Sequence, residues 1–184
     1  RLALIHTVEE LCRQAVFAAH EKLGYSRISI WFNAPEPDFI QGAWGISETG
    51  ELRDERQSRH RARAPNMLNV IRGECQLDQA DNVELRDKEG RVVGKGAHAV
   101  AALWDGKEII GAISADDLLN PGSLDKEGAE ILRSFAASLG HLISRNRSEE
   151  ALRLSEQRLQ IVMNTAQEGI NICRIVDGKR QMVL

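Results

Sequence analysis

Apolar and polar residues follow a clear pattern in the middle of the chain, from Gly96 to Arg147. Residues 97–104 form an apolar run of strand length, and residues 108–115 form a second run that is apolar on both faces, as in a central strand covered from both sides. Asp105-Gly106 stands between the runs and favours a tight turn, because both turn positions need a positive φ. The pattern therefore predicts a buried β-hairpin.

A long helix is predicted after this hairpin, from Asp125 to Ala166. Average helices have about 12 residues, so a helix of this length should have a partner along it. Its apolar residues recur three and four positions apart, at Ile131, Leu132, Phe135, Leu139, Leu142 and Ile143. Four of them have the spacing of a seam between two parallel helices, namely Leu132, Phe135, Leu139 and Leu142. We therefore expect a homodimer; the alternative is a second half that folds back on its own domain.

The first part of the chain predicts a helix over Leu2–Leu23 and two strands, Ser26–Asn33 and Asp38–Ser47. Weaker strand patterns follow at Cys75–Gln79 and Arg91–Val93, in a polar, glycine-rich stretch. In the first strand, side chains should alternate between the two faces of a sheet. One face would carry Ile28, Ile30 and Phe32, and the other Ser29, Trp31 and Asn33.

A charged stretch, residues 51–63, lies between these segments, and after Glu55 its charges are all positive. On a helix, Arg53, Arg56 and Arg63 would share a face. These three arginines are candidates for a lid over an anionic ligand. The alternative is a solvated charged face, which is the usual role of charge runs.

Composition narrows the class of protein. The 184 residues are 42% hydrophobic and 28% charged, which is typical of one folded domain plus an extra segment and excludes disorder. The net charge of −3 does not favour nucleic acid as a partner. No apolar run approaches the ~20 residues that span a bilayer, and we expect no membrane segment here. The first residue is Arg1 rather than Met, so we expect a fragment of a longer protein.

The chemistry-bearing residues are scattered. Cys12, Cys75 and Cys173 show no Cys-x-x-Cys spacing, which favours a reducing, cytoplasmic location. No nucleotide-binding, metalloprotease or serine-hydrolase motif occurs, and the five histidines are dispersed, so we predict no catalytic residues and no metal site. Asp116-Asp117 could coordinate a cation, but capping of the next helix by Ser123 or Asp125 is the simpler interpretation. His98, in an apolar strand, is expected to be a hydrogen-bonded core histidine.

The hairpin and the long helix together resemble the C-terminal half of a GAF domain. The segments that carry the resemblance are Leu103–Lys107, Ile110–Asp116 and the helix from Asp125. It implies an α+β fold with α/β/α layers, in which the N- and C-terminal helices cover one face of an antiparallel sheet. A ligand pocket would lie on the other face.

By that resemblance, eight residues are candidates to line the pocket: Ser29, Trp31, Asn33, Trp44, Met67, His98, Val100 and Ser114. Their ligand stays unknown. The sequence lacks the motif typical of cyclic-nucleotide-binding relatives, the Cys-His pair of bilin-binding relatives and the clustered cysteines of methionine sulfoxide reductases, and no haem signature is found.

The end of the chain resembles the start of a PAS domain. Leu154-Ser155-Glu156-x-Arg158-Leu159 is followed by Asn164-Thr165-Ala166-x-Glu168-Gly169-Ile170. We then expect strands at Asn171–Val176 and Gln181–Leu184 with a turn at Asp177-Gly178. The predicted organisation is a GAF domain over 1–147, a connecting signalling helix over 148–166 and a truncated PAS domain over 167–184.

Such an order resembles sensor histidine kinases of two-component systems and cyclic-di-GMP enzymes. It implies a non-enzymatic sensory module that binds a small ligand or a partner and passes its state through a dimeric helix to a downstream output domain. Two alternatives remain, a ligand-free dimerisation module and an enzyme built on the GAF fold.

Overall fold

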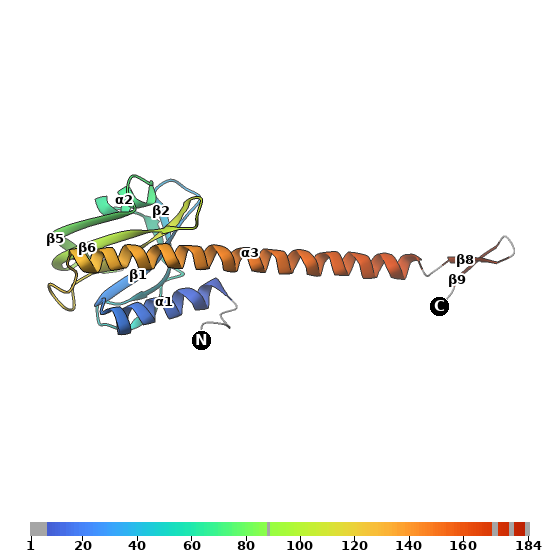
Figure 1. Ribbon diagram of the computed structural model, residues 1–184, viewed down its shortest axis with the longest axis horizontal. Helices are drawn as coiled ribbons and strands as arrows, with labels where there is room; N and C mark the ends of the chain where they lie inside the picture. The colour runs from blue at the N-terminus through green and yellow to red at the C-terminus, as the bar shows by residue number, and fades with distance from the viewer. Residues whose placement is uncertain (1–6, 88, 171–172, 177–178, 183–184) are drawn as a thin grey trace. The chain divides into compact units, whose positions relative to one another are not determined.

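The computed structural model describes residues 7–87, 89–170, 173–176 and 179–182 (Figure 1). The chain divides into two compact units, Arg1–Arg145 and Asn146–Leu184. In the first unit the elements follow the order α1 (Val8–Leu23), β1 (Arg27–Asn33), β2 (Phe39–Ile46), β3 (Leu52–Asp54), β4 (Arg59–Arg61), α2 (Pro65–Ile71), β5 (Leu77–Arg86), β6 (Val92–Trp104), β7 (Ile109–Asp116) and the first part of α3 (Lys126–Ile170).

Among the described residues, seven strands form one antiparallel sheet in the order β3-β2-β1-β7-β6-β5, with β4 also paired to β2. The central strands β1 and β7 pair along their length, from Arg27 opposite Asp116 to Phe32 opposite Gly111. This is the α+β architecture that the resemblance to GAF domains implied, and the buried hairpin predicted from the apolar pattern is the β6–β7 pair.

One face of the sheet, the helix face, is covered by α1 and α3. Ile28 and Ile30 of β1 are buried in the core on this face, and Phe32 packs against it. From α1 the core takes Leu11, Cys12, Ala15, Val16 and Ala19, and from α3 it takes Ala129, Leu132, Ala136, Leu139 and Ile143. The other face, the α2 face, has its own core beneath α2, with Met67 and Val70 from the helix. The predicted alternation of β1 is thereby confirmed.

Gly140 allows α3 to approach the sheet closely. A Cβ atom at this position would lie 2.3 Å from the carbonyl oxygen of Trp104, far inside contact distance. The backbone of α3 therefore lies directly against the backbone at the end of β6. The residue next to it, His141, lies beside the loop that joins β6 to β7, near Gly106.

Local structure departs from the sequence predictions at several places. The weak strand predicted at Cys75–Gln79 is the longer β5, and the one predicted at Arg91–Val93 is the first part of β6. The first helix begins at Val8, because Thr7 is extended and its Oγ1 accepts a hydrogen bond from the backbone of Glu10; residues 2–6 lie outside the described residues. The β6–β7 loop runs over residues 105–108 rather than two residues, since Asp105 Oδ1 accepts from the backbone N–H groups of Lys107 and Glu108. The charged stretch forms the short strands β3 and β4, not a helix.

The helix α3 begins where the sequence predicted. Asp125 Oδ1 accepts a hydrogen bond from the backbone N–H of Gly128 at 2.8 Å, which is the N-cap interaction expected for this residue. In the second unit, the helix is followed by the antiparallel pair β8 (Cys173–Val176) and β9 (Lys179–Met182). The predicted strand residues 171–172 and 183–184 and the predicted turn at 177–178 lie outside the described residues.

Candidate functional site

Six of the eight predicted pocket residues lie together on the α2 face, on neighbouring strands and on α2 itself. They are Ser29, Trp31, Met67, His98, Val100 and Ser114. Met67 and Val100 are buried in the apolar core beneath α2. The others contribute polar atoms to the same face, so this region is the candidate functional site.

Two neighbouring hydrogen-bonded sets, here together called the polar cluster, lie on β1, β7, β6 and α2. It consists of Ser29, Trp31, Asn66, His98 and Ser114. Trp31 donates from Nε1 to Ser29 Oγ at 2.7 Å, and Ser29 is the direct cross-strand partner of Ser114. His98 Nε2 lies 3.2 Å from Ser114 Oγ, and its Nδ1 lies 2.9 Å from the side-chain nitrogen of Asn66. The cluster therefore spans the centre of the sheet.

The surroundings of His98 determine which of its nitrogens carries the proton. Asn66 Oδ1 accepts from the backbone N–H of Met67 at 3.0 Å, which fixes the amide and presents its NH₂ group to His98. Nδ1 must then accept, so Nε2 carries the hydrogen and donates to Ser114. Burial lowers the pKa of His98, against the opposing effect of the nearby Asp116 carboxylate. His98 is hydrogen-bonded, as expected, and is partly buried in its strand. The neutral ring is favoured.

Glu55 lies beside the polar cluster and is 4% exposed. Its Oε1 accepts from Arg53 Nε and Nη2 at 3.1 and 2.7 Å, whereas its buried Oε2 has no hydrogen-bond partner in the described part of the chain. Burial raises the pKa of Glu55, although the Arg53 guanidinium opposes the shift. A Cβ on Gly45 would lie 2.9 Å from Ser29 Cβ and 3.0 Å from the carboxyl carbon of Glu55, so this glycine leaves the space that the carboxyl group occupies.

Two predicted pocket residues, Trp44 and Asn33, do not lie on the α2 face. A β-bulge in β2 explains the position of Trp44. Ser29 pairs with Gly45 but Trp31 pairs with Gly42, so β2 contains one more residue than β1 over this interval. Such a bulge re-aims the side chains that follow it, and Trp44 packs against the core of the helix face. Asn33 lies at the exposed end of β1, where its side chain donates to the backbone oxygen of Ile109.

The three arginines of the predicted anion lid do not converge on this site. Arg53 is held by Glu55 and also by Glu48, at 2.9 Å. Arg56 is held by Asp54 and Glu9, each at 2.6 Å, and Arg63 is exposed. Because carboxylates already balance Arg53 and Arg56, these residues fit the alternative of a charged, internally paired surface.

The predicted dimer seam is divided between the core and the surface. Leu132 is 0% and Leu139 3% exposed in the domain's own core, whereas Leu142 is 46% exposed. Phe135 is partly buried against the same core. Leu132 and Leu139 are therefore not available to a second copy of the chain, because helical periodicity marks a buried face without specifying what covers it.

The remaining chemical candidates are structural. Cys12 is buried on the helix face and Cys75 packs on the α2 face, so the sheet separates them. Asp117 accepts from the backbone N–H groups of Ala97 and Gly122, and Asp116 accepts from Arg27. Among the described residues, His, Cys, Asp and Glu side chains form no group of three or more that could hold a metal ion.

Asn66 and Glu55 are the residues of the site that the sequence predictions missed. Asn66 follows Pro65 at the start of a helix and carries no motif. Glu55 is hidden in the charged stretch, but Gly42 and Gly45 gave an indirect signal. A Cβ on Gly42 would lie 2.4 Å from the backbone oxygen of Glu55, so both glycines mark a close approach of the chain.

Comparisons with known proteins identify the fold. A scan against models of protein families found no match, and a search of curated proteins found none either. Residues 122 to 287 of a methyl-accepting chemotaxis protein match with a TM-score of 0.59 and 17% identity, over 79% of this chain and 94% of that one. The second GAF domain of DevS from Mycobacterium smegmatis matches with a TM-score of 0.58 and 14% identity, over 79% of this chain and 99% of that one.

A third match is a domain from a two-component sensor histidine kinase protein of Sinorhizobium meliloti 1021, with a TM-score of 0.57 and 19% identity, over 80% of this chain and 97% of that one. Free methionine-R-sulfoxide reductases of Neisseria meningitidis and Thermoplasma acidophilum match as well. The chain therefore has a GAF-like fold, shared by sensory proteins and by enzymes. None of its described helices combines the length and hydropathy of a bilayer-spanning segment.

Proposed function

We propose that this chain is the sensory and regulatory module of an intracellular, cytoplasmic signalling protein. In this proposal the α2 face binds a small molecule, and a dimeric α3 passes the bound state to a downstream output domain, such as a histidine kinase or a cyclic-di-GMP enzyme. The similarity to a chemotaxis protein and to a sensor-kinase domain supports this role. The β8–β9 hairpin after α3 fits the start of a PAS domain.

The observation that carries the proposal is the polar cluster with the unpartnered Oε2 of Glu55 beside it. A buried polar atom without a partner costs about 1–3 kcal/mol, and a bound ligand that donates a hydrogen bond to it would remove that cost. Ser29 and Ser114 add hydroxyl groups, and Trp31 supplies an aromatic surface. The ligand class is therefore a small molecule with an N–H or O–H donor and an apolar part.

The enzymatic alternative has less support. The methionine sulfoxide reductases that share the fold suggest cysteine chemistry, but the sheet separates Cys12 from Cys75. Burial also raises the pKa of the Cys75 thiol, with Asp78 and Glu74 acting in the same direction. A raised pKa disfavours the reactive thiolate, so we assign no catalytic role to these residues.

For the dimer, a groove of about 510 Å³ on the outer side of α1 and α3 replaces the predicted seam. Its apolar lining includes Phe17, which is 52% exposed, together with Phe135 and Leu142. Two basic residues, Arg13 and Lys22, also line the groove, and Arg13 is already paired with Glu10. We propose that the same groove of a second copy covers this surface, because a twofold interface brings identical patches together.

In the second unit, α3 also presents apolar side chains without cover. Leu152 and Leu159 lie seven residues apart, and Val162 follows three residues later; all three are exposed. This spacing matches the a and d positions of a parallel two-stranded coiled coil. A second copy of the helix is the partner that would bury them.

Ligand binding is tested by native mass spectrometry of the purified chain with a mixture of the standard amino acids and nucleosides. We expect an added mass that Ser114→Phe abolishes, because the new ring fills the polar cluster, and that Glu55→Gln weakens. Lys107→Phe, in the exposed β6–β7 loop, is the control and should retain the ligand. If no variant and no wild-type sample carries an added mass, the ligand-free dimerisation module is the better description.

Dimerisation is tested by sedimentation velocity at micromolar concentration. Phe17→Glu and Leu142→Glu should convert a dimer into a folded monomer, whereas Leu119→Glu, at an exposed loop position, should leave the dimer intact. Leu139→Glu should instead unfold the domain, since it puts a charge into the core. A wild-type chain that sediments as a monomer would exclude the dimer.

A further inference from the structure

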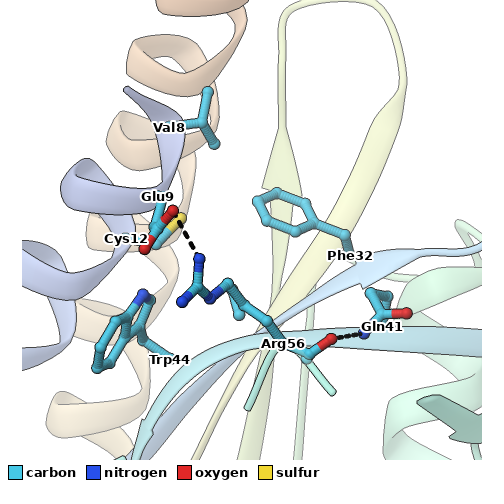
Figure 2. A pocket seen from close by; sticks show the side chains of 9 residues that line it. Val8, Glu9, Cys12, Phe32, Gln41, Trp44 and Arg56 are labelled. Carbon is cyan, nitrogen blue, oxygen red and sulfur yellow. Dashed lines mark hydrogen bonds and ion pairs between the residues drawn. The ribbon is translucent and has the colours of Figure 1, made fainter. Parts of the chain in front are cut away.

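A separate cavity of about 230 Å³ lies on the helix face, between the first turn of α1 and β2 (Figure 2). The sheet separates it from the polar cluster, so it goes beyond the function proposed above. Val8 and Cys12 from α1, Phe32 from β1 and Trp44 from β2 form its apolar walls. Glu9 and Arg56 also line it.

The β-bulge in β2 places the indole ring of Trp44 in the wall of this cavity. The extra residue directs Trp44 toward α1, and the buried indole Nε1 has no hydrogen-bond acceptor among the described residues. Bulges occur often beside functional sites, where they re-aim a side chain. An acceptor on a bound molecule would satisfy this N–H group. A water molecule is a poor candidate, because ordered waters need roughly two to four polar partners and the surrounding walls are mostly carbon.

The Glu9–Arg56 ion pair forms one side of the cavity. Arg56 Nη1 lies 2.6 Å from Glu9 Oε2, and the guanidinium carbon lies 5.9 Å from the centre of the Trp44 ring. Figure 2 shows the Arg56 side chain between Glu9 and Trp44. Both charged side chains are about half exposed, and ion pairs of this kind contribute little stability. Opening the pair therefore costs little and would give access to the indole nitrogen.

We propose that this cavity is a binding site for a small neutral molecule with a single substituted ring and one hydrogen-bond acceptor, and that Glu9 and Arg56 form its movable cover. A cavity of ~150 Å³ holds benzene, so this one has room for a ring with a short substituent. Neutral ligands are favoured because Arg56 is already balanced by Glu9 and Asp54. An anion would have to displace one of these carboxylates.

Acetophenone and ethylbenzene are matched probes, since they have similar size and only the ketone accepts a hydrogen bond. In the ¹⁵N-labelled chain, the indole N–H signals of Trp31, Trp44 and Trp104 are assigned by single Trp→Phe variants. Acetophenone should shift the Trp44 signal downfield in a saturable way and leave the other two unchanged. Ethylbenzene should bind about fivefold more weakly, the difference expected from one hydrogen bond.

Two variants separate this site from adventitious binding. By ligand-detected NMR, Trp44→Phe should reduce acetophenone affinity to that of ethylbenzene, whereas Trp104→Phe, outside the cavity, should change neither. Ala43→Leu should fill the cavity and abolish binding of both probes, with circular dichroism confirming that it folds. The proposal would be overturned if acetophenone caused no saturable shift of the Trp44 signal in the folded wild type. It would also be overturned if Trp44→Phe bound acetophenone as tightly as the wild type does.

Discussion

On the helix face, the strands bury Ile28, Ile30 and Leu103 against α1 and α3; on the α2 face, the same strands present serine, histidine and tryptophan side chains to a single short helix. The first face gains stability mainly from apolar area, which many arrangements of similar side chains can supply. The second combines a smaller apolar core with individual hydrogen bonds, and these bonds tolerate few alternative arrangements. The difference assigns the larger share of the fold's apolar core to the helix face and the hydrogen-bonded polar side chains to the α2 face.

The largest expected effect concerns the helix face. Leu132→Ala should lower the free energy of unfolding by about 2–5 kcal/mol, because it leaves a cavity in the core. Leu142→Ala, ten residues further along the same helix, should change it by only about 0.5 kcal/mol or less. Both changes in the free energy of unfolding can be measured by urea unfolding in a protein that also carries Phe17→Glu. This substitution is expected to keep the protein monomeric, so dimerisation does not contribute to the measurement. Equal losses at the two positions would contradict the placement of Leu132 in the core and of Leu142 at the surface.

On the α2 face, Asn66→Ala should cost about 1–3 kcal/mol, because His98 Nδ1 and the Met67 N–H each lose a partner. Asn69→Ala, which removes a partly exposed contact to Asp78, is the matched control and should cost less. Thermal and urea unfolding give the comparison. An Asn66→Ala protein as stable as the control would mean that the polar cluster does not order this face.

The protonation of His98 should make stability depend on pH. Because its pKa is lowered in the folded chain from the ordinary value of 6.5, the unfolded chain binds the proton more readily, and stability should fall as pH decreases below about 6.5. His98→Gln should reduce this slope. His60 also has a lowered pKa, but it is exposed, so His60→Gln should change the slope less. Urea unfolding at several pH values measures both slopes.

The smallest expected effect has the opposite sign and concerns Glu55. Its pKa is raised in the folded chain above the ordinary 4.5, so the stability that it contributes at low pH is lost as pH rises through the folded value. Glu55→Gln should remove this loss and make the protein slightly more stable near neutral pH. Glu48 has a lowered pKa, held by a backbone hydrogen bond and by Arg53, so Glu48→Gln should be slightly destabilising there. If both substitutions changed the free energy of unfolding in the same direction near neutral pH, the opposite pKa shifts of Glu55 and Glu48 would be contradicted.

Much of the architecture could be predicted from the sequence because it depends on local periodicity. Alternation placed Ile30 and Trp31 on opposite faces correctly, and the cap at Asp125 marked the start of α3. Periodicity fails where one residue is added, and the bulge in β2 moved Trp44 to the opposite face. One sequence does not show which residues of two strands pair with each other. The extra residue in β2, and the shift of Trp44 that it causes, therefore could not be predicted.

The site was predictable only in part, for a different reason. Strand alternation, together with the resemblance to GAF domains, placed Ser29, His98 and Ser114 on one face of the sheet, where they lie. Glu55 was not, since its burial depends on how the β3–β4 segment crosses Gly42 and Gly45. In α3, the apolar spacing of Leu132 and Leu139 is the same whether a sheet or a second helix covers them. The burial of Glu55 and the partner of Leu132 and Leu139 depend on tertiary contacts, which one sequence does not show.

The contact at Gly140 has a mechanical consequence. Most helices rest on a sheet through side chains, which can change rotamer and absorb a small displacement. At Gly140 the backbone of α3 meets the carbonyl group of Trp104 directly, so no flexible layer lies between them. This point would act as a fulcrum: a shift at the end of β6 would tilt the helix instead of being damped. A methyl group from Gly140→Ala would force the two backbones apart and displace that pivot.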